Sequence, residues 1–387
     1  MAADLFSSTQ TLTPPTTEEE RLSWLRLLRS RRVGVTTFFR LMHEHGSADA
    51  ALTALPHVAH AAGVSGYETC PLPVIRKEMQ AARKAGARLI CYGEATYPKA
   101  LTEIPDPPPV LWAIGDISLL QRPMVALVGA RNASSLGTRM ARKMAADLAA
   151  KGMVVVSGLA RGVDTAAHTA ALPGGTIAVQ AGGVDVIYPV ENTALADSIA
   201  KQGLRLSEDP IGLQPQARHF PKRNRIISGL SKAVVVIEAA ARSGSLITAR
   251  NALDQGREVL AVPGHPFDGR ASGTNMLIRD GATLVRSAAD VMEAIAEPAA
   301  PPTPHVEQVP AAPPAPAAAP ESPPRRKLRD MNNLHNEILQ RLGPSPLAED
   351  QLIRDLDLPA RKVSPEVVAL ELEGKITRVP GGMLCKA

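Results

Sequence analysis

A basic segment with an aromatic ring near its start is the first feature that could do chemistry. The fifteen residues from Arg218 to Lys232 carry five Lys or Arg side chains and no acidic one, and Phe220 stands near their beginning. Cations neutralise phosphates and an aromatic face stacks on bases, so this combination is typical of a groove for single-stranded nucleic acid. Taken alone, the segment fits equally well a solvated basic helix that is anchored by a buried Phe220.

Four short loops rich in glycine, alanine and serine predict an anion site. They span residues 129–135, 157–164, 181–183 and 241–248, and each follows an aliphatic run. Small residues let a ligand approach the backbone, and free N–H groups at a helix start attract anions. Ligands of open α/β sheets bind beyond the carboxyl ends of the strands, so these loops predict a phosphate-lined cleft. Together with the basic segment, the cleft favours DNA binding, and the candidate residues are Gly129, Arg131, Ser157, Gly158, Arg218, Phe220, Lys222, Arg223, Asn224, Arg225, Ser243, Gly244 and Ser245.

The sequence holds no familiar nucleotide-binding or catalytic motif. The first loop is not G-x-G-x-x-G and no G-x-x-x-x-G-K-[ST] occurs, so neither standard NAD binding nor P-loop hydrolysis is supported. No Ser-His-Asp elbow, H-E-x-x-H pair or metal cluster is found, and we expect no catalytic residue, no metal and no cofactor. Asp164 and Glu208 are interpreted as loop-ordering acceptors or N-caps, and His168 as a structural residue within a helix.

Short aliphatic runs that alternate with helix-length segments must position these loops. Between residues 88 and 298, strands are expected at 124–130, 152–160, 175–182, 204–209, 233–240, 257–264 and 282–285. Apolar strands separated by amphipathic helices are typical of a parallel sheet that is covered on both faces. The sequence therefore predicts an α/β domain with a Rossmann-like, doubly wound, mostly parallel sheet.

The segments on either side of this domain have different compositions. Residues 1–16 are rich in Ser, Thr and Pro and are expected to be disordered, whereas residues 17–87 show helical periodicity. A hairpin near Gly34 fits a helix-hairpin-helix-like module, which either holds nucleic-acid phosphates or serves as plain packing. Residues 299–327 form a Pro/Ala-rich linker, and residues 328–387 predict three helices and a β-hairpin, a winged helix-turn-helix. The net charge of +1 over residues 326–387 is weak for a duplex-binding domain.

Composition and charge restrict the class of protein. The chain has 387 residues and a net charge of +5, which permits an anionic partner without requiring one. Three scattered cysteines suit a reducing cytoplasm and exclude a disulfide framework. No secretory signal and no apolar run long enough to span a membrane are visible, so a cytoplasmic protein without a membrane partner is expected.

Several long motifs in the expected order resemble the DNA processing protein A (DprA/Smf) family. They include VALVGARNAS from residue 125, VVVSGLARGVDTAAHTAAL from residue 154, IYPVENTAL from residue 187 and the whole run from His219 to Gly264. The resemblance implies a non-enzymatic protein that binds and protects incoming single-stranded DNA and loads RecA onto it during natural transformation. It also implies a homodimer formed through the Rossmann-like domain, a sterile-alpha-motif-like N-terminal domain and a winged-helix tail.

The resemblance carries roles to individual positions. The family's phosphate-gripping Gly-Ser/Thr-Arg motif corresponds to residues 129–131, where Ala130 lacks the hydroxyl and Arg131 keeps the guanidinium. The family's base-contacting aromatic corresponds to Phe220, with basic neighbours alongside. Some members carry a Lys three residues earlier; that position is Ala217 here, and Arg218 is its expected substitute.

Two other functions are also compatible with parts of the sequence. A nucleotide phosphoribohydrolase-like enzyme would use the same cleft, although its Pro-Gly-Gly-x-Gly-Thr-x-x-Glu loop is replaced here by a segment at 241–248 with no following Glu. A transcription regulator would act through the winged helix, which the near-neutral charge of the tail disfavours. The expected ligand of the tail is DNA, RecA or the protein's own core.

Overall fold

The computed structural model describes residues 12–296 and, with short gaps, residues 334–386. The chain divides into two compact units, Met1–Pro301 and Pro302–Ala387, which are taken one at a time. Residues 12–16 were expected to be disordered, but Leu12 packs on the N-terminal helices and Thr16 donates its hydroxyl proton to the carboxylate of Glu20 at 3.0 Å. The predicted linker 299–327 and residues 1–11 lie outside the described residues.

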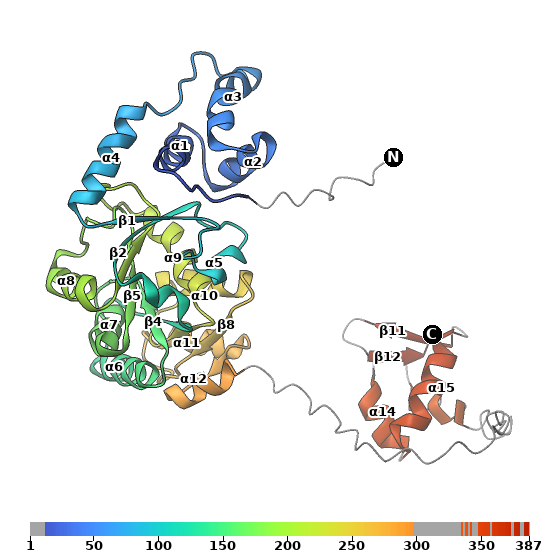
Figure 1. Ribbon diagram of the computed structural model, residues 1–387. Coiled ribbons are helices and arrows are strands. Elements are labelled where there is room, and N and C mark those ends of the chain that lie inside the picture. The colour runs from blue at the N-terminus through green and yellow to red at the C-terminus, as the bar shows by residue number, and fades with distance from the viewer. Residues whose placement is uncertain are drawn as a thin grey trace, which may run out of the picture. The chain divides into compact units, whose positions relative to one another are not determined.

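A mixed sheet forms the centre of the first unit. Its strands are β1 (Arg88–Cys91), β2 (Val110–Gly115), β3 (Met124–Val128), β4 (Val154–Ser157), β5 (Thr176–Val179), β6 (Leu204–Ser207), β7 (Ala233–Val236), β8 (Glu258–Ala261) and β9 (Thr283–Leu284). They are ordered β1-β2-β6-β5-β4-β3-β7-β8-β9 (Figure 1). Strands β3 to β9 pair in parallel, which confirms the predicted doubly wound sheet. Strands β1 and β2 were not predicted, and they add an antiparallel edge beside β6.

Helices cover both faces of the sheet. They are α5 (Lys99–Thr102), α6 (Ser135–Ala150), α7 (Val163–Ala171), α8 (Thr193–Gln202), α9 (His219–Leu230), α10 (Gly244–Asp254), α11 (Ser272–Arg279) and α12 (Ala288–Ala294). Successive residues of a strand point to opposite faces of the sheet. In β3, Val125 and Leu127 pack with α6, α7 and α12 on one face. Ala126 and Val128 pack with α5, α9 and α10 on the other. This arrangement explains why the strands read as continuous apolar runs, since both of their faces are buried.

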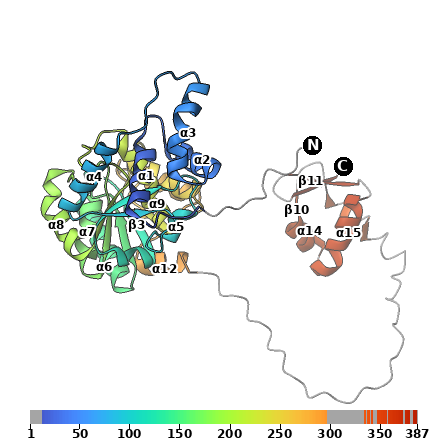
Figure 2. The ribbon, with the colours of Figure 1, turned by 45° about the horizontal axis from the view of Figure 1, so that its top comes forward.

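Four N-terminal helices pack against the antiparallel edge of the sheet. They are α1 (Glu18–Arg29), α2 (Val35–His45), α3 (Ala48–Ala61) and α4 (Leu72–Lys84). Figure 1 shows α1 and the end of α4 next to β1, and Figure 2 shows the same four helices from a second direction. Trp112 of β2 belongs to their shared core, and its indole N–H donates to Glu78 of α4 at 3.1 Å. Helix α3 lies within the region 17–87 that shows helical periodicity; the side chain of Ser47 caps its start by accepting a hydrogen bond from the N–H of Ala50.

The second unit has the elements of a winged helix. Its described elements are β10 (Leu347–Ala348), α14 (Glu349–Leu356), α15 (Ala360–Leu372), β11 (Ile376–Val379) and β12 (Met383–Lys386), and residues 334–335, 337–339 and 341 are also helical. The strands pair in the order β10-β12-β11 around a small aliphatic core. Strands β11 and β12 pair as the predicted β-hairpin, and the residues between them, 380–382, lie outside the described residues.

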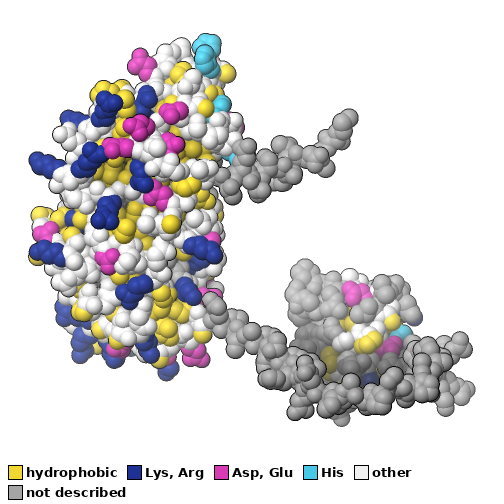
Figure 3. Space-filling model, in the orientation of Figure 1, with side chains coloured by type: hydrophobic (Ala, Val, Ile, Leu, Met, Phe, Trp, Pro, Cys, Tyr) yellow, Lys and Arg dark blue, Asp and Glu magenta, His cyan; other side chains and the backbone are white. Residues whose placement is uncertain are grey.

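The charges of the first unit are dispersed on the face drawn in Figure 3. There, Lys and Arg side chains are interspersed with Asp, Glu and hydrophobic side chains, rather than gathered into one basic field. Binding of an anion on this face would therefore depend on individual, well-placed cations. None of the helices in the described parts of the chain has the length and apolar character needed to cross a membrane.

Candidate nucleic-acid interface

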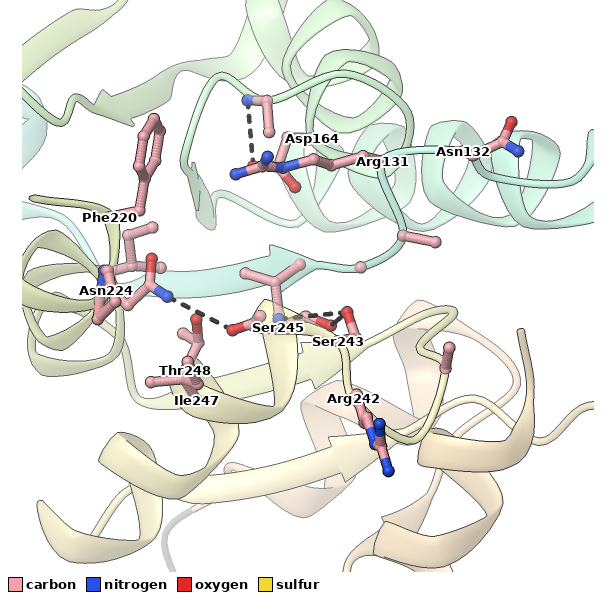
Figure 4. Close-up of a pocket in the computed structure, with 18 of the residues that line it drawn as sticks. Arg131, Asn132, Asp164, Phe220, Asn224, Arg242, Ser243, Ser245, Ile247 and Thr248 are labelled. Atoms are coloured by element: carbon pink, nitrogen blue, oxygen red, sulfur yellow. Dashed lines mark hydrogen bonds between the residues drawn. The ribbon is translucent and has the colours of Figure 1, made fainter. Parts of the chain in front are cut away.

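A cavity of about 620 Å³ opens where the strand order reverses. Chain connections run from β3 outward to β6 and then return to β7 on the other side of β3, so the carboxyl ends of β3 and β7 flank a topological switch point. The cavity is lined by residues of the loop after β3, of the loop after β7 and of the first turns of α9. Figure 4 shows these side chains converging from different elements.

Most of the predicted binding residues line this cavity or its neighbour. The larger cavity is lined by Gly129, Arg131, Phe220, Arg223, Asn224, Ser243, Gly244 and Ser245. A second cavity of about 340 Å³ shares Arg131 and Phe220 and adds Gly158 and Tyr188. The side chains of Arg131 and Phe220 therefore border both spaces, and we call the two cavities together the cleft.

Three side chains from three separate segments of the chain meet at this border: Arg131 and Tyr188 come from loops and Phe220 from the first turn of α9. The guanidinium carbon of Arg131 lies 5.3 Å from the centroid of the Phe220 ring, a cation–π distance. The ring of Tyr188 lies 5.7 Å from that of Phe220, tilted by 59°, and Tyr188 is 50% exposed. This group offers a guanidinium to a phosphate and two ring surfaces to bases, the chemistry that binding of a single strand requires.

Arg223 supports the cleft from within the protein. It is buried, and its Nη1 donates to the carbonyl oxygen of Gly158 at 2.7 Å and to that of Val179. A Cβ atom at position 158 would lie 2.3 Å from this nitrogen, so Gly158 is required by the packing of Arg223. Burial lowers the pKa of Arg223 to about 10. Its guanidinium carbon also lies 6.0 Å from the centroid of the Phe220 ring, so Arg223 contacts this ring from the protein interior.

Two other basic residues of α9 are engaged by acids. Arg225 is buried and forms ion pairs with Glu208 at 2.6 Å and with Asp106 at 2.9 Å. Lys222 is half-exposed but lies 3.5 Å from the same carboxylate of Glu208. Neither residue lines the cleft, because both side chains extend toward Glu208, which directly follows β6. The interpretation of Glu208 as a loop acceptor or cap is therefore wrong, since it is the buried partner of these cations, and burial raises its pKa.

Two further predicted residues lie outside both cavities. Ser157 is fully buried and donates its hydroxyl proton to the carbonyl oxygen of Leu127 at 2.6 Å, which removes it from any ligand. Arg218 is exposed just before α9, and its Nε donates to the ring of His219 at 3.4 Å. The sequence could not separate these residues from their neighbours, because the direction of a side chain at the end of an element depends on packing.

Three of the four predicted anion loops are already occupied by carboxylates of the protein: in the loop at 157–164, Asp164 accepts from the N–H groups of Gly158 and Ala160. Glu238 accepts hydrogen bonds from the backbone N–H and the hydroxyl group of Ser134, at the start of α6. Asp209 accepts from the N–H of Gly182 at 2.9 Å. These acids take the positions that a phosphate would use, so an anion in the cleft must rely chiefly on Arg131 and on the loop at 241–248.

Asp164 and His168 behave as the sequence predicts. Asp164 accepts from the N–H groups of Gly158 and Ala160 at 3.1 and 3.3 Å, so it orders the loop after β4, and burial raises its pKa. His168 is fully buried in α7, where its Nδ1 lies 2.7 Å from the hydroxyl of Thr176. Burial lowers the pKa of His168 to about 3, which makes it a neutral structural residue.

The cleft also contains residues that the sequence did not single out. Arg242 and Arg270 line the larger cavity opposite Phe220, and Tyr188 lines the smaller one. The scarcity of aromatic residues was the available signal for Tyr188, since the chain has only 4 Tyr and 5 Phe. Within the described residues, no group of three or more His, Cys, Asp or Glu could hold a metal ion.

Comparison with known proteins covers nearly every part of the described chain. The family model for DNA recombination-mediator protein A matches residues 88–296. The models for the DprA-like N-terminal HHH domain and for the DprA winged helix domain match residues 18–81 and 310–382. The order of these matches is that of the helical, α/β and winged-helix parts described above.

Individual proteins give the same result. The DNA processing protein DprA of Bacillus subtilis is 46% identical over 228 residues, which is 58% of this chain and 77% of that protein. The X-ray structure of DprA from Streptococcus pneumoniae superposes with a TM-score of 0.61 at 36% identity, over 70% of this chain and 97% of that one. DNA processing protein A from Helicobacter pylori, whose structure concerns a mode of single-stranded DNA binding, matches with a TM-score of 0.50 at 33% identity, over 54% and 95%. The chain therefore belongs to the DprA/Smf family of DNA processing proteins.

Proposed function

We propose that this protein is a non-enzymatic recombination mediator, which binds and protects incoming single-stranded DNA and loads RecA onto it during natural transformation. The observation that carries the proposal is the contact between Arg131 and Phe220 at the switch point of the sheet. The match to the recombination-mediator family model and the single-stranded DNA binding of the Helicobacter pylori relative support it.

The cleft favours a single strand over a duplex. The rings of Phe220 and Tyr188 lie inside or at the edge of cavities, where only an unstacked base can reach them. Arg131 has an exposed guanidinium that can hold a phosphate in a bidentate manner. Gly244 at the start of α10 adds a backbone N–H group on the facing wall, whereas the N–H groups of Ser243 and Ser245 donate to the carbonyl oxygen of Ala240 and to the hydroxyl of Ser243.

The residues of the cleft support binding rather than catalysis. Asp164, which lines the larger cavity, is buried and accepts two backbone N–H groups. Glu191, which lines the smaller cavity, lies 3.7 Å from the guanidinium of Arg161. Both carboxylates thus have partners within the protein, whereas a general base must reach the proton that it abstracts. Incubation with nucleoside monophosphates should therefore release no free base, and release at ordinary enzyme turnover would favour the phosphoribohydrolase alternative.

Fluorescence anisotropy of labelled oligothymidine and of a matched duplex, across a salt series, tests the proposal directly. We expect tighter binding of the single strand, with log affinity falling by about 0.7 per phosphate neutralised for each tenfold increase in salt. Equal affinity for both forms would move the site away from this cleft. RecA loading is tested by the DNA-dependent ATPase of RecA on strands coated with a single-stranded-DNA-binding protein, which the protein should stimulate.

We further propose that the protein acts as a homodimer in the cytoplasm. Strand β9 ends the described sheet with Leu284 44% exposed, which leaves an apolar residue on an open edge. Light scattering of the wild type and of Leu284→Arg should give a dimer and a monomer, and an unchanged mass would place the interface elsewhere. The free Cys70, Cys91 and Cys385 suit a reducing compartment.

A further inference from the structure

We propose that Phe267 is a second base-stacking residue, which holds the DNA strand outside the cleft on the side opposite Phe220. This inference rests on the proposed binding of single-stranded DNA and extends it to the loop between β8 and α11. Phe267 is 94% exposed, in a chain that has only 5 Phe. Such a ring has a large apolar surface with a defined stacking geometry, and in this position nearly all of it is accessible to an external partner.

The loop that carries Phe267 is tied at its base. Asn275 exchanges two hydrogen bonds with the backbone of Gly264, at 3.1 and 3.0 Å, which closes the loop. The N–H of Gly273 donates to the carbonyl oxygen of Ala239 at 2.7 Å, in the segment after β7. Phe267 is therefore presented from an anchored loop, and little conformational entropy is lost when a base stacks on it.

The same loop is continuous with the wall of the cleft. Arg270, three residues after Phe267, lines the larger cavity together with Arg242. The hydroxyl of Ser272 accepts a hydrogen bond from the N–H of Ala241 at 3.0 Å, which links the loop of Phe267 to the loop of Arg242. A strand that leaves the cleft past these two arginines thus arrives at the loop of Phe267.

The immediate surroundings of Phe267 suit a nucleobase. The ring of His265 lies 5.6 Å from that of Phe267 at an interplanar angle of 38°, so the two form one aromatic surface. The one acid of the loop, Asp268, is paired with the guanidinium of Arg270 at 3.1 Å, which limits its repulsion of phosphates. Aromatic rings beside cations are the recurring elements of single-strand grooves, because the rings hold bases of any sequence.

The test compares Phe267→Leu and Phe267→Tyr with Val74→Ala, an exposed apolar position on α4 that serves as the control. Binding is measured by anisotropy with oligothymidines of about six and about sixteen nucleotides, which lie within the usual range of such sites. We expect Phe267→Leu to weaken binding of the longer strand about fivefold, which corresponds to the lower end of the stacking energy of one base on an aromatic ring. Binding of the shorter strand should be weakened less. Phe267→Tyr and Val74→Ala should retain wild-type affinity, since tyrosine keeps the ring.

The other possible outcomes would each support or overturn the assignment of Phe267. Unchanged affinity of Phe267→Leu for the longer strand, while Arg131→Ala loses affinity, would overturn this inference and leave the proposed function standing. A change of mass in light scattering for Phe267→Leu would assign the ring to a protein contact instead. Failure of the wild type to bind any single strand would overturn both proposals. Photocrosslinking of 5-iodouracil strands to the peptide that contains Phe267 would support the inference without reliance on any variant.

Discussion

The guanidinium of Arg131 lies over the aromatic ring of Phe220, with its carbon 5.3 Å from the ring centroid. These two residues are far apart in the sequence, one after β3 and the other in the first turn of α9. The contact holds a long cation in place ahead of ligand binding, which lowers the entropy lost on binding. It also joins the group that would hold a phosphate to the ring that would hold the neighbouring base.

Arg131→Ala should weaken binding of all single strands alike, because phosphate contacts carry no sequence information. The salt dependence should also become shallower, by about 0.7 in the slope of log affinity against log salt for each phosphate that is no longer neutralised. Arg131→Lys should bind with intermediate affinity, since lysine keeps the positive charge but lacks the planar, bidentate donors of a guanidinium. Anisotropy titrations check both variants. Arg76→Ala on α4 is the control for charge, and loss of affinity for one sequence only would contradict this role.

Phe220→Leu should reduce the affinity for single strands by about 1–3 kcal/mol, the usual value of one base stacked on an aromatic ring. Phe220→Tyr should keep most of the wild-type affinity. The salt slope should stay close to that of the wild type in both variants, because no cation is removed. This separation of affinity from salt slope distinguishes Phe220 from Arg131. Equal binding by Phe220→Leu and the wild type would show that the bases lie elsewhere.

Glu208→Gln should destabilise the first unit by about 3 kcal/mol, because it leaves a buried guanidinium without its anionic partner. The affected cation is Arg225, which lies 2.6 Å from Glu208 and keeps only the more exposed Asp106. Urea unfolding followed by circular dichroism measures the change. The control is Glu103→Gln, which removes an ion pair with Arg257. The Glu103 side chain is 51% exposed, so this variant should lower the free energy of unfolding by less than about 1 kcal/mol. Equal effects of the two variants would contradict the assignment of Arg225 as a buried structural cation.

His168 should make the protein lose stability as the pH falls. The hydroxyl of Thr176 donates to the carbonyl oxygen of Val155, so it accepts from Nδ1–H of His168, while Nε2 accepts from the N–H of Leu159. Only the neutral ring fits this arrangement, and burial lowers its pKa from 6.5 to about 3. Below pH 6.5 the unfolded chain therefore binds a proton that the folded chain does not, and unfolding is favoured.

The comparison of the wild type with His168→Gln isolates this effect. Stability from His168 is fully present above pH 6.5 and falls by about 2 kcal/mol on going to pH 5. Glutamine does not titrate, so its variant should lose about 2 kcal/mol less between pH 7 and pH 5 in urea unfolding. Parallel pH dependence of the two proteins would mean that the histidine is charged in the folded state.

The sequence by itself determined the class of the fold and the edge at which the site lies. Apolar runs such as 124–130 and 233–240 have the length of strands and are rich in valine, so they indicate strands buried on both faces rather than segments of a buried helix. The carboxyl ends of parallel strands share one edge, so the loops of Arg131 and Ser243 could be assigned to it from the sequence alone. Strands β1 and β2 were not predicted, although β2 is an apolar run that lies between Pro109 and Asp116; what the sequence does not specify is their antiparallel pairing beside β6.

Only the tertiary structure decided which of the chosen residues face a ligand. Arg223 and Arg225 are two positions apart in one basic run, yet both are buried, one against backbone carbonyls and the other against Glu208. Arg131 reaches Phe220, and Tyr188 joins them from another loop, through contacts that no local pattern specifies. Periodicity reports how apolar each position is, but it carries no information on which distant acid will meet a given cation. That choice is made by the order of the strands and the packing of α9 on the sheet.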